Sequence, residues 1–333
     1  METRIESITA ESLAAAKKIL EEGGAVAFPT ETVDGLGAGA RRDDAVKRIY
    51  EIKGRPSDDP LIVHIHEEYD LSLLVADDSS YAFKLREAFL PGPLTLVYKS
   101  KGKVSSVVSC GLDTLAVRVP SHPAAREFLR YVDMPVAAPS ANISKHVSPV
   151  SAEHVFNDLN GRIPLILDGG DCSGGIESTV CDVTGEYPVV LREGLISREM
   201  IARVAGKCGL YVPRAGEKVR SPGMKYKHYA PTCDTYLFGA EDAAKARERF
   251  ESFAAAGKRV VALCEHSVAG HFPDGYVLDL GASPEEMATN LYRRLREGEK
   301  LADIIIAVKP KEQDGIMAGV QNRLIKACGG ELK

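Results

Sequence analysis

The chain has 333 residues and a mass of 35.9 kDa, which is too long for one typical hydrophobic core and predicts about two domains. Apolar residues make up 44% and charged residues 27%, so the apolar surface is sufficient for folding and intrinsic disorder is excluded as the main state. The net charge of −5 argues against a wholly basic nucleic-acid binder, although a local basic surface is compatible with it.

Cysteine usage and the N-terminal sequence indicate the compartment. The seven cysteines are odd in number and no two are separated by two residues, so neither a disulfide framework nor a zinc site is indicated. The N-terminus lacks the apolar core of a signal peptide, and no apolar run approaches the ~20 residues of a membrane helix. We therefore expect a soluble, cytoplasmic protein with no membrane partner.

Helical and strand patterns alternate along the first part of the chain. Thr9 is the predicted N-cap of a helix that Gly23-Gly24 ends, and a short buried strand follows at 25–28. The sequence then predicts a glycine-rich turn at 35–39 and a helix at 45–53. Further strands are predicted at 61–65, 94–98, 115–119, 136–138, 165–167, 178–183 and 189–191, and helices at 82–89, 124–131, 152–159 and 198–205. This pattern predicts an α/β domain over residues 9–197, with short connections that allow parallel and antiparallel pairing.

A change of composition predicts a linker over residues 206–231 and a smaller domain over 232–333. The linker has several Gly and Pro breaks and no apolar period, and is either a passive tether or, given its Lys, His and Tyr residues, functional. Strands at 235–238, 260–263, 276–280 and 304–308 alternate with helices at 240–253, 284–296 and 316–327. The alternation is typical of a Rossmann-like parallel sheet. Because none of its strands is followed by a glycine-rich phosphate motif, we place no catalysis there.

Four cations lie near predicted element ends, where ligands of α/β sheets commonly bind. They are Lys53, Arg55, Arg118 and Arg192. Each has an ordinary alternative: the Lys53–Arg55 segment is also typical of a solvated loop, and Arg118, inside an apolar strand, also fits a core salt bridge. Together they favour one cleft for an anionic ligand, without the P-loop, H-E-x-x-H or G-x-S-x-G motifs, which the sequence lacks.

Hydroxyl and amide side chains accompany these cations. They occur in Pro29-Thr30-Glu31-Thr32, at Thr114, in Pro139-Ser140-Ala141-Asn142, at Ser148 and in Ser178-Thr179. For each segment alone, ordinary turn chemistry is the simpler interpretation. Their repeated occurrence where buried strands stop favours a shared polar site.

These segments, in this order, resemble the YrdC-domain family, in its two-domain (long-form) threonylcarbamoyl-AMP synthase type. The resemblance covers essentially the whole chain, more loosely over the last hundred residues. Its motifs are Phe28-Pro29-Thr30-Glu31-Thr32-Val33, Lys53-Gly54-Arg55-Pro56, Pro60-Leu61-Ile62-Val63-His64, Pro139-Ser140-Ala141-Asn142, Glu177-Ser178-Thr179-Val180, Leu191-Arg192-Glu193-Gly194 and Ser221-Pro222-Gly223-Met224-Lys225-Tyr226-Lys227-His228-Tyr229-Ala230-Pro231.

The resemblance implies a YrdC-like twisted mixed sheet with flanking helices and a reaction of L-threonine, bicarbonate or CO2, and ATP. The products are threonylcarbamoyl-AMP and pyrophosphate, and a downstream tRNA threonylcarbamoyl transferase uses the first to modify tRNA next to the anticodon. Mg²⁺ is expected with ATP, with no organic cofactor and no metal held by the protein alone, and weak tRNA contact is a further expectation.

The resemblance also implies which residues form the site. Lys53, Arg55 and Arg118 are the expected catalytic cations. Threonine is expected to contact Thr32, His64, Arg118, Ala138 and Ser178. ATP is expected to contact Arg55, Asp59, Thr114, Ser140, Asn142, Ser148, Arg192 and Tyr229. His64 is expected either to orient threonine or to accept a proton, and the linker around Tyr229 to act as a lid over the site.

Two residues depart from the family pattern. Asp34 stands where Tyr is common and Asp59 where Asn is usual, so both add negative charge near an anionic ligand.

There are two rival functions. The first is that of a carbamoyl transferase of the hydrogenase-maturation type, which normally carries zinc-finger and acylphosphatase segments that the sequence does not show. An RNA-binding module would use the same basic cleft and would lose affinity steeply with salt.

Overall fold

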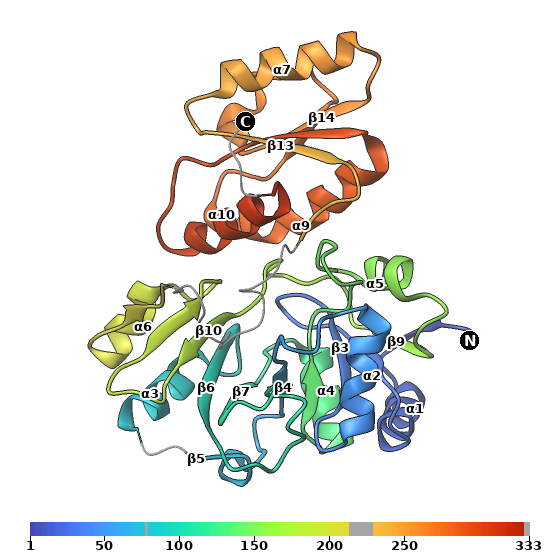
Figure 1. Cartoon of the computed structure of the whole chain (residues 1–333), viewed down its shortest axis with the longest axis vertical. Helices are drawn as coiled ribbons and strands as arrows, with labels where there is room; N and C mark the ends of the chain where they lie inside the picture. The colour runs from blue at the N-terminus through green and yellow to red at the C-terminus, as the bar shows by residue number, and fades with distance from the viewer. Residues whose placement is uncertain (77–78, 213–228, 330–333) are drawn as a thin grey trace. The chain divides into compact units, whose positions relative to one another are not determined.

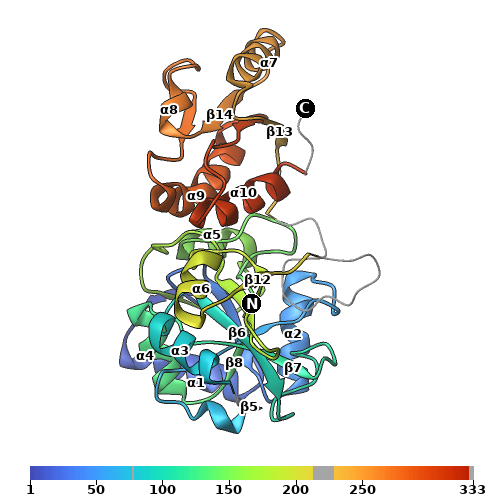
Figure 2. The ribbon, with the colours of Figure 1, turned by 90° about the vertical axis from the view of Figure 1, so that its left-hand side faces the viewer.

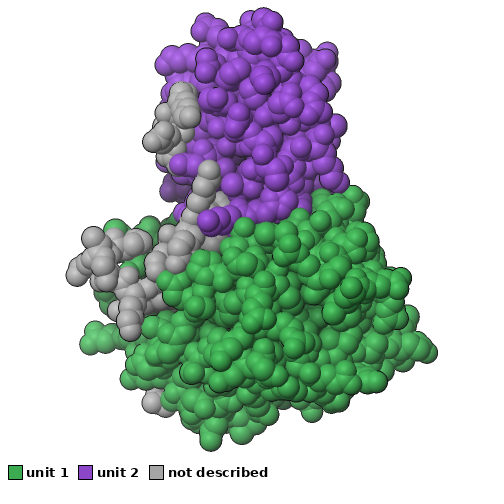
Figure 3. Space-filling model, turned by 45° about the vertical axis from the view of Figure 1, so that its right-hand side comes forward, with its two compact units in different colours: residues 1–144, 149–173, 177–225 green, residues 145–148, 174–176, 226–333 purple. Residues whose placement is uncertain are grey.

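The computed structural model describes residues 1–76, 79–212 and 229–329 (Figure 1). These residues form two compact units, which Figure 3 colours separately. The first comprises 1–144, 149–173 and 177–225, and the second comprises 145–148, 174–176 and 226–333. Most of the predicted linker, residues 213–228, lies outside the described residues.

The first unit is a mixed α/β fold, as the sequence predicts. Its strands run in the order β1-β9-β2-β3-β8-β4-β7-β6-β10-β11-β12, with β5 paired to β6, and both parallel and antiparallel neighbours occur. The strands are β1 (Arg4–Ser7), β2 (Val26–Phe28), β3 (Gly35–Gly39), β4 (Ile62–His64), β5 (Val75–Ala76), β6 (Leu94–Ser100), β7 (Thr114–Arg118), β8 (Val136–Ala138), β9 (Leu165–Asp168), β10 (Thr179–Asp182), β11 (Val189–Arg192) and β12 (Gly209–Leu210).

Helices cover this sheet on both faces because successive side chains of a strand point to opposite sides. In β2, Val26 and Phe28 join a core with helices α1 and α4, which pack together (Figures 1 and 2), whereas Ala27 joins the core of the other helices. The helices are α1 (Ala10–Glu21), α2 (Asp43–Lys53), η1 (Leu71–Leu73, a 3-10 turn), α3 (Ser80–Phe89), α4 (Pro123–Val132), α5 (Ala152–Leu159) and α6 (Arg198–Ala205).

Local sequence signals place most of these elements. Thr9 caps α1 as predicted, its hydroxyl accepting a hydrogen bond from the backbone N–H of Ser12, and Gly54 ends α2 in the left-handed conformation. The sequence did not indicate β1, η1, β5 or β12. These are short, and three of them carry exposed residues, so they give no apolar period to detect.

The glycine-rich segment 35–39 is a strand, and its prediction as a turn was wrong. It forms β3, paired with β2 and β8. A Cβ on Gly37 would lie 2.7 Å from Val136 Cγ1 and 2.9 Å from Phe28 Cε1, so the glycine is needed for close packing between neighbouring side chains. A glycine selected for close approach is indistinguishable from a turn glycine in sequence alone.

Gly37→Ala is expected to destabilise the first unit by about 1–3 kcal/mol through overpacking against Val136 and Phe28. Gly39→Ala, on the same strand, is the matched control, because the nearest atom to its new Cβ would be 3.8 Å away. Urea unfolding followed by far-ultraviolet circular dichroism gives both free energies of unfolding. Equal values for the two variants would contradict the packing argument.

The second unit is a parallel α/β fold, in agreement with the sequence. Its sheet runs β13-β16-β14-β15, and its pairings are parallel. The elements are β13 (Asp234–Phe238), α7 (Ala243–Ala255), β14 (Val260–Cys264), α8 (His266–Ala269), β15 (Val277–Asp279), α9 (Pro284–Leu301), β16 (Ile304–Val308) and α10 (Ile316–Ala327). In the described parts of the chain, no helix is long and apolar enough to cross a membrane.

Candidate functional site

One face of the first sheet carries a small apolar floor between two polar ends. The floor consists of Ile62, Val97, Ala116, Val180 and Leu191, which come from β4, β6, β7, β10 and β11. We call this surface the site face. Because side chains alternate along a strand, residues two positions before or after a floor residue lie on the same face.

The alternation of side chains and the strand register place the residues that were predicted to contact the substrate threonine at one end of the site face, which we call the threonine end. Arg118 lies two residues after Ala116 on β7, and His64 lies two residues after Ile62 on β4. His64 and Arg118 are paired directly in the parallel β4–β7 ladder. The same register places Thr114, which was predicted to contact ATP, level with Pro60 and four residues before Arg118. We call this end of the site face the nucleotide end. At about 3.3 Å per residue, the two ends of the site face lie roughly 13 Å apart.

The Arg118 guanidinium is buried and held on three sides. Its Nε donates to the Gly92 carbonyl (3.2 Å), its Nη1 donates to Thr32 Oγ1 (2.8 Å), and its Nη2 lies 2.7 Å from Glu31 Oε1. Of the two alternatives that the sequence left open, the core salt bridge is present, and the role of Arg118 as a site residue stays a prediction. A guanidinium has five N–H donors, so two remain for a ligand beyond these three described contacts.

Thr32 is fixed by its neighbours. Thr30 Oγ1 donates to the Val33 carbonyl (2.7 Å), so in the 2.9 Å contact between the two hydroxyls Thr32 is the donor. The Thr32 oxygen is thereby oriented to accept from Arg118. The segment that follows β2 thus forms one side of the threonine end.

His64 is a neutral imidazole in a dry environment. Its side chain is 4% exposed and meets the Phe28 ring edge-on at a centroid distance of 5.8 Å. Burial, followed by the neighbouring Arg118 charge, lowers the pKa of His64 to about 3. Among the described residues its Nδ1 has no hydrogen-bond partner, so this buried nitrogen is available to a ligand.

The imidazole of His64 is expected not to titrate between pH 5 and 8, since its pKa of about 3 keeps it neutral throughout that range. Proton NMR of the histidine C2–H signals, with His64→Gln used to assign the resonance, measures this directly. The exposed His266 is the internal control, because its contact with Asp279 raises its pKa above the ordinary value. A His64 midpoint near 6.5 would contradict the burial argument.

Ser178 and Arg192 complete the threonine end. The pairing of Leu96 with Val117 places Thr95 level with Arg118, and Ser178 Oγ lies 2.8 Å from Thr95 Oγ1. Arg192 Nη2 donates to the Ser178 carbonyl (3.0 Å) and to Ser178 Oγ (3.3 Å). Arg192, predicted for ATP, therefore lies beside a residue predicted for threonine.

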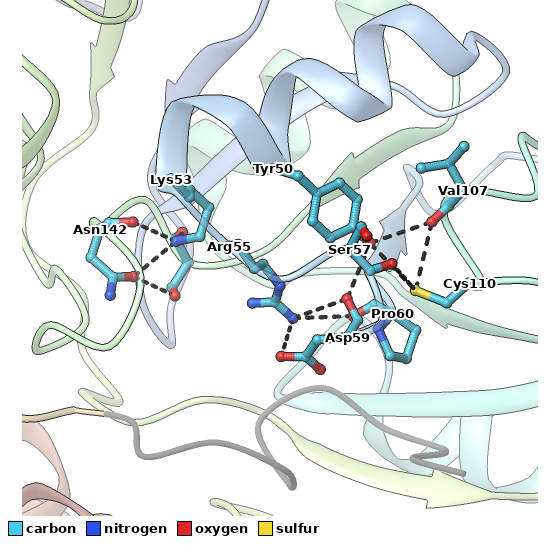
Figure 4. Close-up of polar contacts among 10 residues, drawn as sticks. Tyr50, Lys53, Arg55, Ser57, Asp59, Pro60, Val107, Cys110 and Asn142 are labelled. Atoms are coloured by element: carbon cyan, nitrogen blue, oxygen red, sulfur yellow. Dashed lines mark hydrogen bonds and ion pairs between the residues drawn. The ribbon is translucent and has the colours of Figure 1, made fainter.

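At the other end of the site face, Lys53 holds the segment that follows β8. Its buried ammonium donates to the Ser140 carbonyl (2.5 Å), the Asn142 carbonyl (2.5 Å) and Asn142 Oδ1 (3.2 Å) (Figure 4). Burial, followed by the charge of Arg55, lowers the pKa of Lys53 well below its ordinary value. Ala138, predicted for threonine, ends β8 opposite Ile62 and so lies between the two ends.

Arg55 and Asp59 form a buried ion pair at this end. Arg55 Nη2 lies 2.8 Å from Asp59 Oδ2, and Asp59 is fully buried (Figure 4). Tyr50 Oη donates to the Asp59 carbonyl (3.1 Å), which fastens the loop further. The alternative interpretation of this segment as a solvated loop is therefore wrong for Arg55, because its side chain is buried against Asp59.

Two residues that were predicted to contact ATP, Ser148 and Tyr229, belong to the second unit. Ser148 is fully buried, and the carbonyl of the preceding Val147 accepts a hydrogen bond from Arg296 Nη2 of α9. The Tyr229 ring packs on Tyr292 at a centroid distance of 5.3 Å. The lid function expected of the linker around Tyr229 falls mainly on residues 213–228, outside the described residues.

Glu31 and Thr95 are the polar groups that the sequence-based list of site residues omitted. Glu31 contacts Arg118, and Thr95 contacts Ser178. In the sequence, each is a polar residue within or directly after an apolar strand, which is equally typical of an ordinary turn or a surface position. Only the folded structure shows that Glu31 contacts Arg118 and that Thr95 contacts Ser178.

Comparisons with known proteins identify the family of the chain. The family model described as telomere recombination, named for Sua5, YciO and YrdC, matches residues 18–194, and that of the threonylcarbamoyl-AMP synthase C-terminal domain matches residues 196–329. The threonylcarbamoyl-AMP synthase of Pyrococcus abyssi is 42% identical over 93% of this chain and 92% of its own length. The Bacillus subtilis protein of that name is 43% identical over 96% and 94%.

The chain belongs to the threonylcarbamoyl-AMP synthase family.

A solved structure of this family supports the fold as well. The P. abyssi protein Sua5 complexed with L-threonine has a TM-score of 0.90 and 40% identity, covering 99% of this chain and 98% of that one. The two family matches confirm the two-domain form that the sequence motifs indicated.

Proposed function

We propose that this chain is an L-threonylcarbamoyl-AMP synthase, which converts L-threonine, bicarbonate or CO2, and ATP into threonylcarbamoyl-AMP and pyrophosphate. The observation that carries the proposal is the arrangement of the site face in a chain of this family. One end gathers Thr32, His64, Arg118 and Ser178, and the other gathers Arg55, Asp59, Thr114, Ser140 and Asn142. An amino acid and a nucleotide fit such an arrangement side by side.

The threonine end supplies groups for each part of the amino acid. Arg118 retains two N–H donors in a fork geometry that suits a carboxylate. His64 offers an unpartnered nitrogen for a hydroxyl. Its pKa of about 3 makes it a poor proton acceptor, so we assign it to orienting the substrate rather than to general base catalysis.

The charged residues at the nucleotide end mainly hold other protein groups in place rather than present free charges to the ligand. Lys53 is occupied by carbonyl and amide oxygens, so we assign it to holding Ser140 and Asn142 in place. Arg55 Nη2 donates to the Pro60 carbonyl (3.3 Å), and Pro60 lies level with Thr114, so Arg55 is the proposed phosphate contact at this end.

The chemistry needs no covalent enzyme intermediate. The neutral amine of threonine attacks CO2, forms the carbamate C–N bond and releases a proton. A carbamate oxygen then attacks the α-phosphorus of ATP in line, and the bond to the β-phosphate breaks as pyrophosphate leaves. The enzyme contributes positioning and charge stabilisation at fixed side chains.

Mg²⁺ is proposed to enter with the nucleotide. Such ions usually keep several waters and are held by phosphates with one or two carboxylates. The carboxylate at the nucleotide end, Asp59, is already paired with Arg55, so the ion would be held chiefly by the phosphates. When bound, the ion would neutralise phosphate charge.

The product is a mixed anhydride that water hydrolyses, so a second enzyme must use it soon after its release. We propose that this partner is a tRNA threonylcarbamoyl transferase and that the protein acts in the cytoplasm, where tRNA, ATP and threonine occur together. Contact of this chain with tRNA itself would be weak, in keeping with its net charge of −5.

The enzyme is expected to transfer ¹³C from labelled bicarbonate into threonylcarbamoyl-AMP only when L-threonine and ATP are both present. Mass spectrometry of the product and a pyrophosphate assay measure the two halves of the reaction. Pyrophosphate release that does not depend on threonine and bicarbonate would contradict the assignment, and product formed from carbamoyl phosphate would indicate a carbamoyl transferase.

Asp59→Asn is expected to tighten ATP binding about five- to tenfold. The Asp59 carboxylate neutralises Arg55 in the buried pair, and removing that charge leaves Arg55 to attract phosphate by about 1–1.4 kcal/mol more. Isothermal titration calorimetry of each variant with ATP and Mg²⁺ measures the change.

Asp58→Asn is the matched control for this substitution. It removes the same charge from the neighbouring, exposed residue and is expected to change ATP affinity less than twofold. If both variants gained affinity equally, the effect would be due to net charge alone and the role assigned to the Arg55–Asp59 pair would be wrong.

A further inference from the structure

The ion pair between Glu31 and Arg118 is a buried pair of opposite charges inside the proposed threonine end. The Glu31 side chain is 9% exposed and that of Arg118 is 4% exposed, with 2.7 Å between Oε1 and Nη2. Arg118 and the backbone N–H groups of Glu31 and Ser121 lie near the Glu31 oxygens, but among the described residues no donor forms a hydrogen bond of good geometry with either oxygen. Burial raises the pKa of the Glu31 carboxyl, but Arg118 and nearby backbone N–H groups outweigh it, so the pKa lies below its ordinary value and the group is charged.

We propose that Glu31 binds the ammonium group of the amino-acid substrate and so makes the site selective for a zwitterion. This inference rests on the proposed function. An amino acid carries a carboxylate and an ammonium on one carbon, which is the complement of a guanidinium and a carboxylate held side by side. Arg118 keeps two donors for the substrate carboxylate, and Glu31 keeps acceptor capacity for its ammonium.

Charge balance explains why both members of the pair are needed. If Arg118 were alone, a carboxylic acid without an amine would neutralise it as well as threonine does. With Glu31 present, an amine-free acid places a second carboxylate beside a pair that is already neutral, which leaves one buried negative charge uncompensated. The zwitterion adds no net charge to the site. His64 is neutral and does not alter this balance, and Arg192, which is bonded to Ser178, adds the same charge whichever of the two acids binds, so the difference between them depends on Glu31.

The same charges limit what Glu31 does in the reaction. A carboxyl whose pKa lies below its ordinary value is a weak base toward an ammonium group, so Glu31 selects and places the amine rather than deprotonating it. The ammonium charge is lost when the carbamate forms. The contact with Glu31 is therefore made in the ground state and supports substrate binding more than the later phosphoryl step.

The test compares two ligands with the full-length protein and its Glu31→Gln variant. L-threonine is titrated beside 2,3-dihydroxybutanoate of matching stereochemistry, which keeps the carboxylate and the hydroxyl but has no amine. Glu31→Gln should weaken threonine binding at least about tenfold, while the amine-free acid binds equally or better. Steady-state kinetics should show a raised KM for threonine with kcat changed less than twofold.

Two further measurements separate recognition from a structural role. If Glu31 only holds Arg118 in place, both ligands should lose affinity together, which would overturn the proposal. Glu31→Asp keeps the charge and should retain the preference for threonine over the amine-free acid, so a variant that binds both ligands alike would also overturn it. Circular dichroism melting curves verify that each variant is folded.

The result for the wild-type protein distinguishes this inference from the proposed function. If the wild-type protein bound no threonine in the presence or absence of ATP, the proposed function would fail, and the inference with it. If the wild-type protein bound threonine and Glu31→Gln bound it with equal affinity, only the assignment of Glu31 would fail.

Discussion

The burial of the Arg118 guanidinium is the constraint on which the site depends. A guanidinium cannot lose its charge in a protein, so its removal from water requires acceptors on every side. The structure supplies three acceptors from two distant parts of the chain: the Gly92 carbonyl from one, and Glu31 Oε1 and Thr32 Oγ1 from the other. Because these acceptors lie next to strands β2 and β6 while Arg118 ends β7, the packing of the sheet also fixes the geometry of the threonine end.

Electrostatic neutrality links the two ends of the site face. At one end Arg118 is balanced by Glu31, and at the other Arg55 is balanced by Asp59. Lys53 is satisfied by carbonyl and amide oxygens. The carboxylate of each pair reduces the attraction of its arginine for an anion, so a phosphate would gain less from Arg55 than from an arginine that has no carboxylate beside it.

The sequence predicted the elements of this fold well because most of them have strong local signals. The strands at 136–138 and 304–308 and the helices at 152–159, 198–205 and 316–327 have the bounds that the structure shows. The prediction at 35–39 failed for a non-local reason. A Cβ on Gly37 of β3 would lie too close to Phe28 and Val136, which are on the neighbouring strands. Packing across a sheet is not encoded in a short window of sequence.

For the candidate site, too, the sequence carries local information but not contacts between distant residues. The family motifs identified Thr32, His64, Arg118 and Arg55, but they did not show which residues these side chains contact. Glu31 stands beside Thr32 in the printed sequence, and only strand pairing shows that both residues reach the same guanidinium 86 positions further along the chain from Thr32. Since Glu31 makes Arg118 one half of a buried ion pair, the charge environment of Arg118 is a property of the folded register and not of any motif.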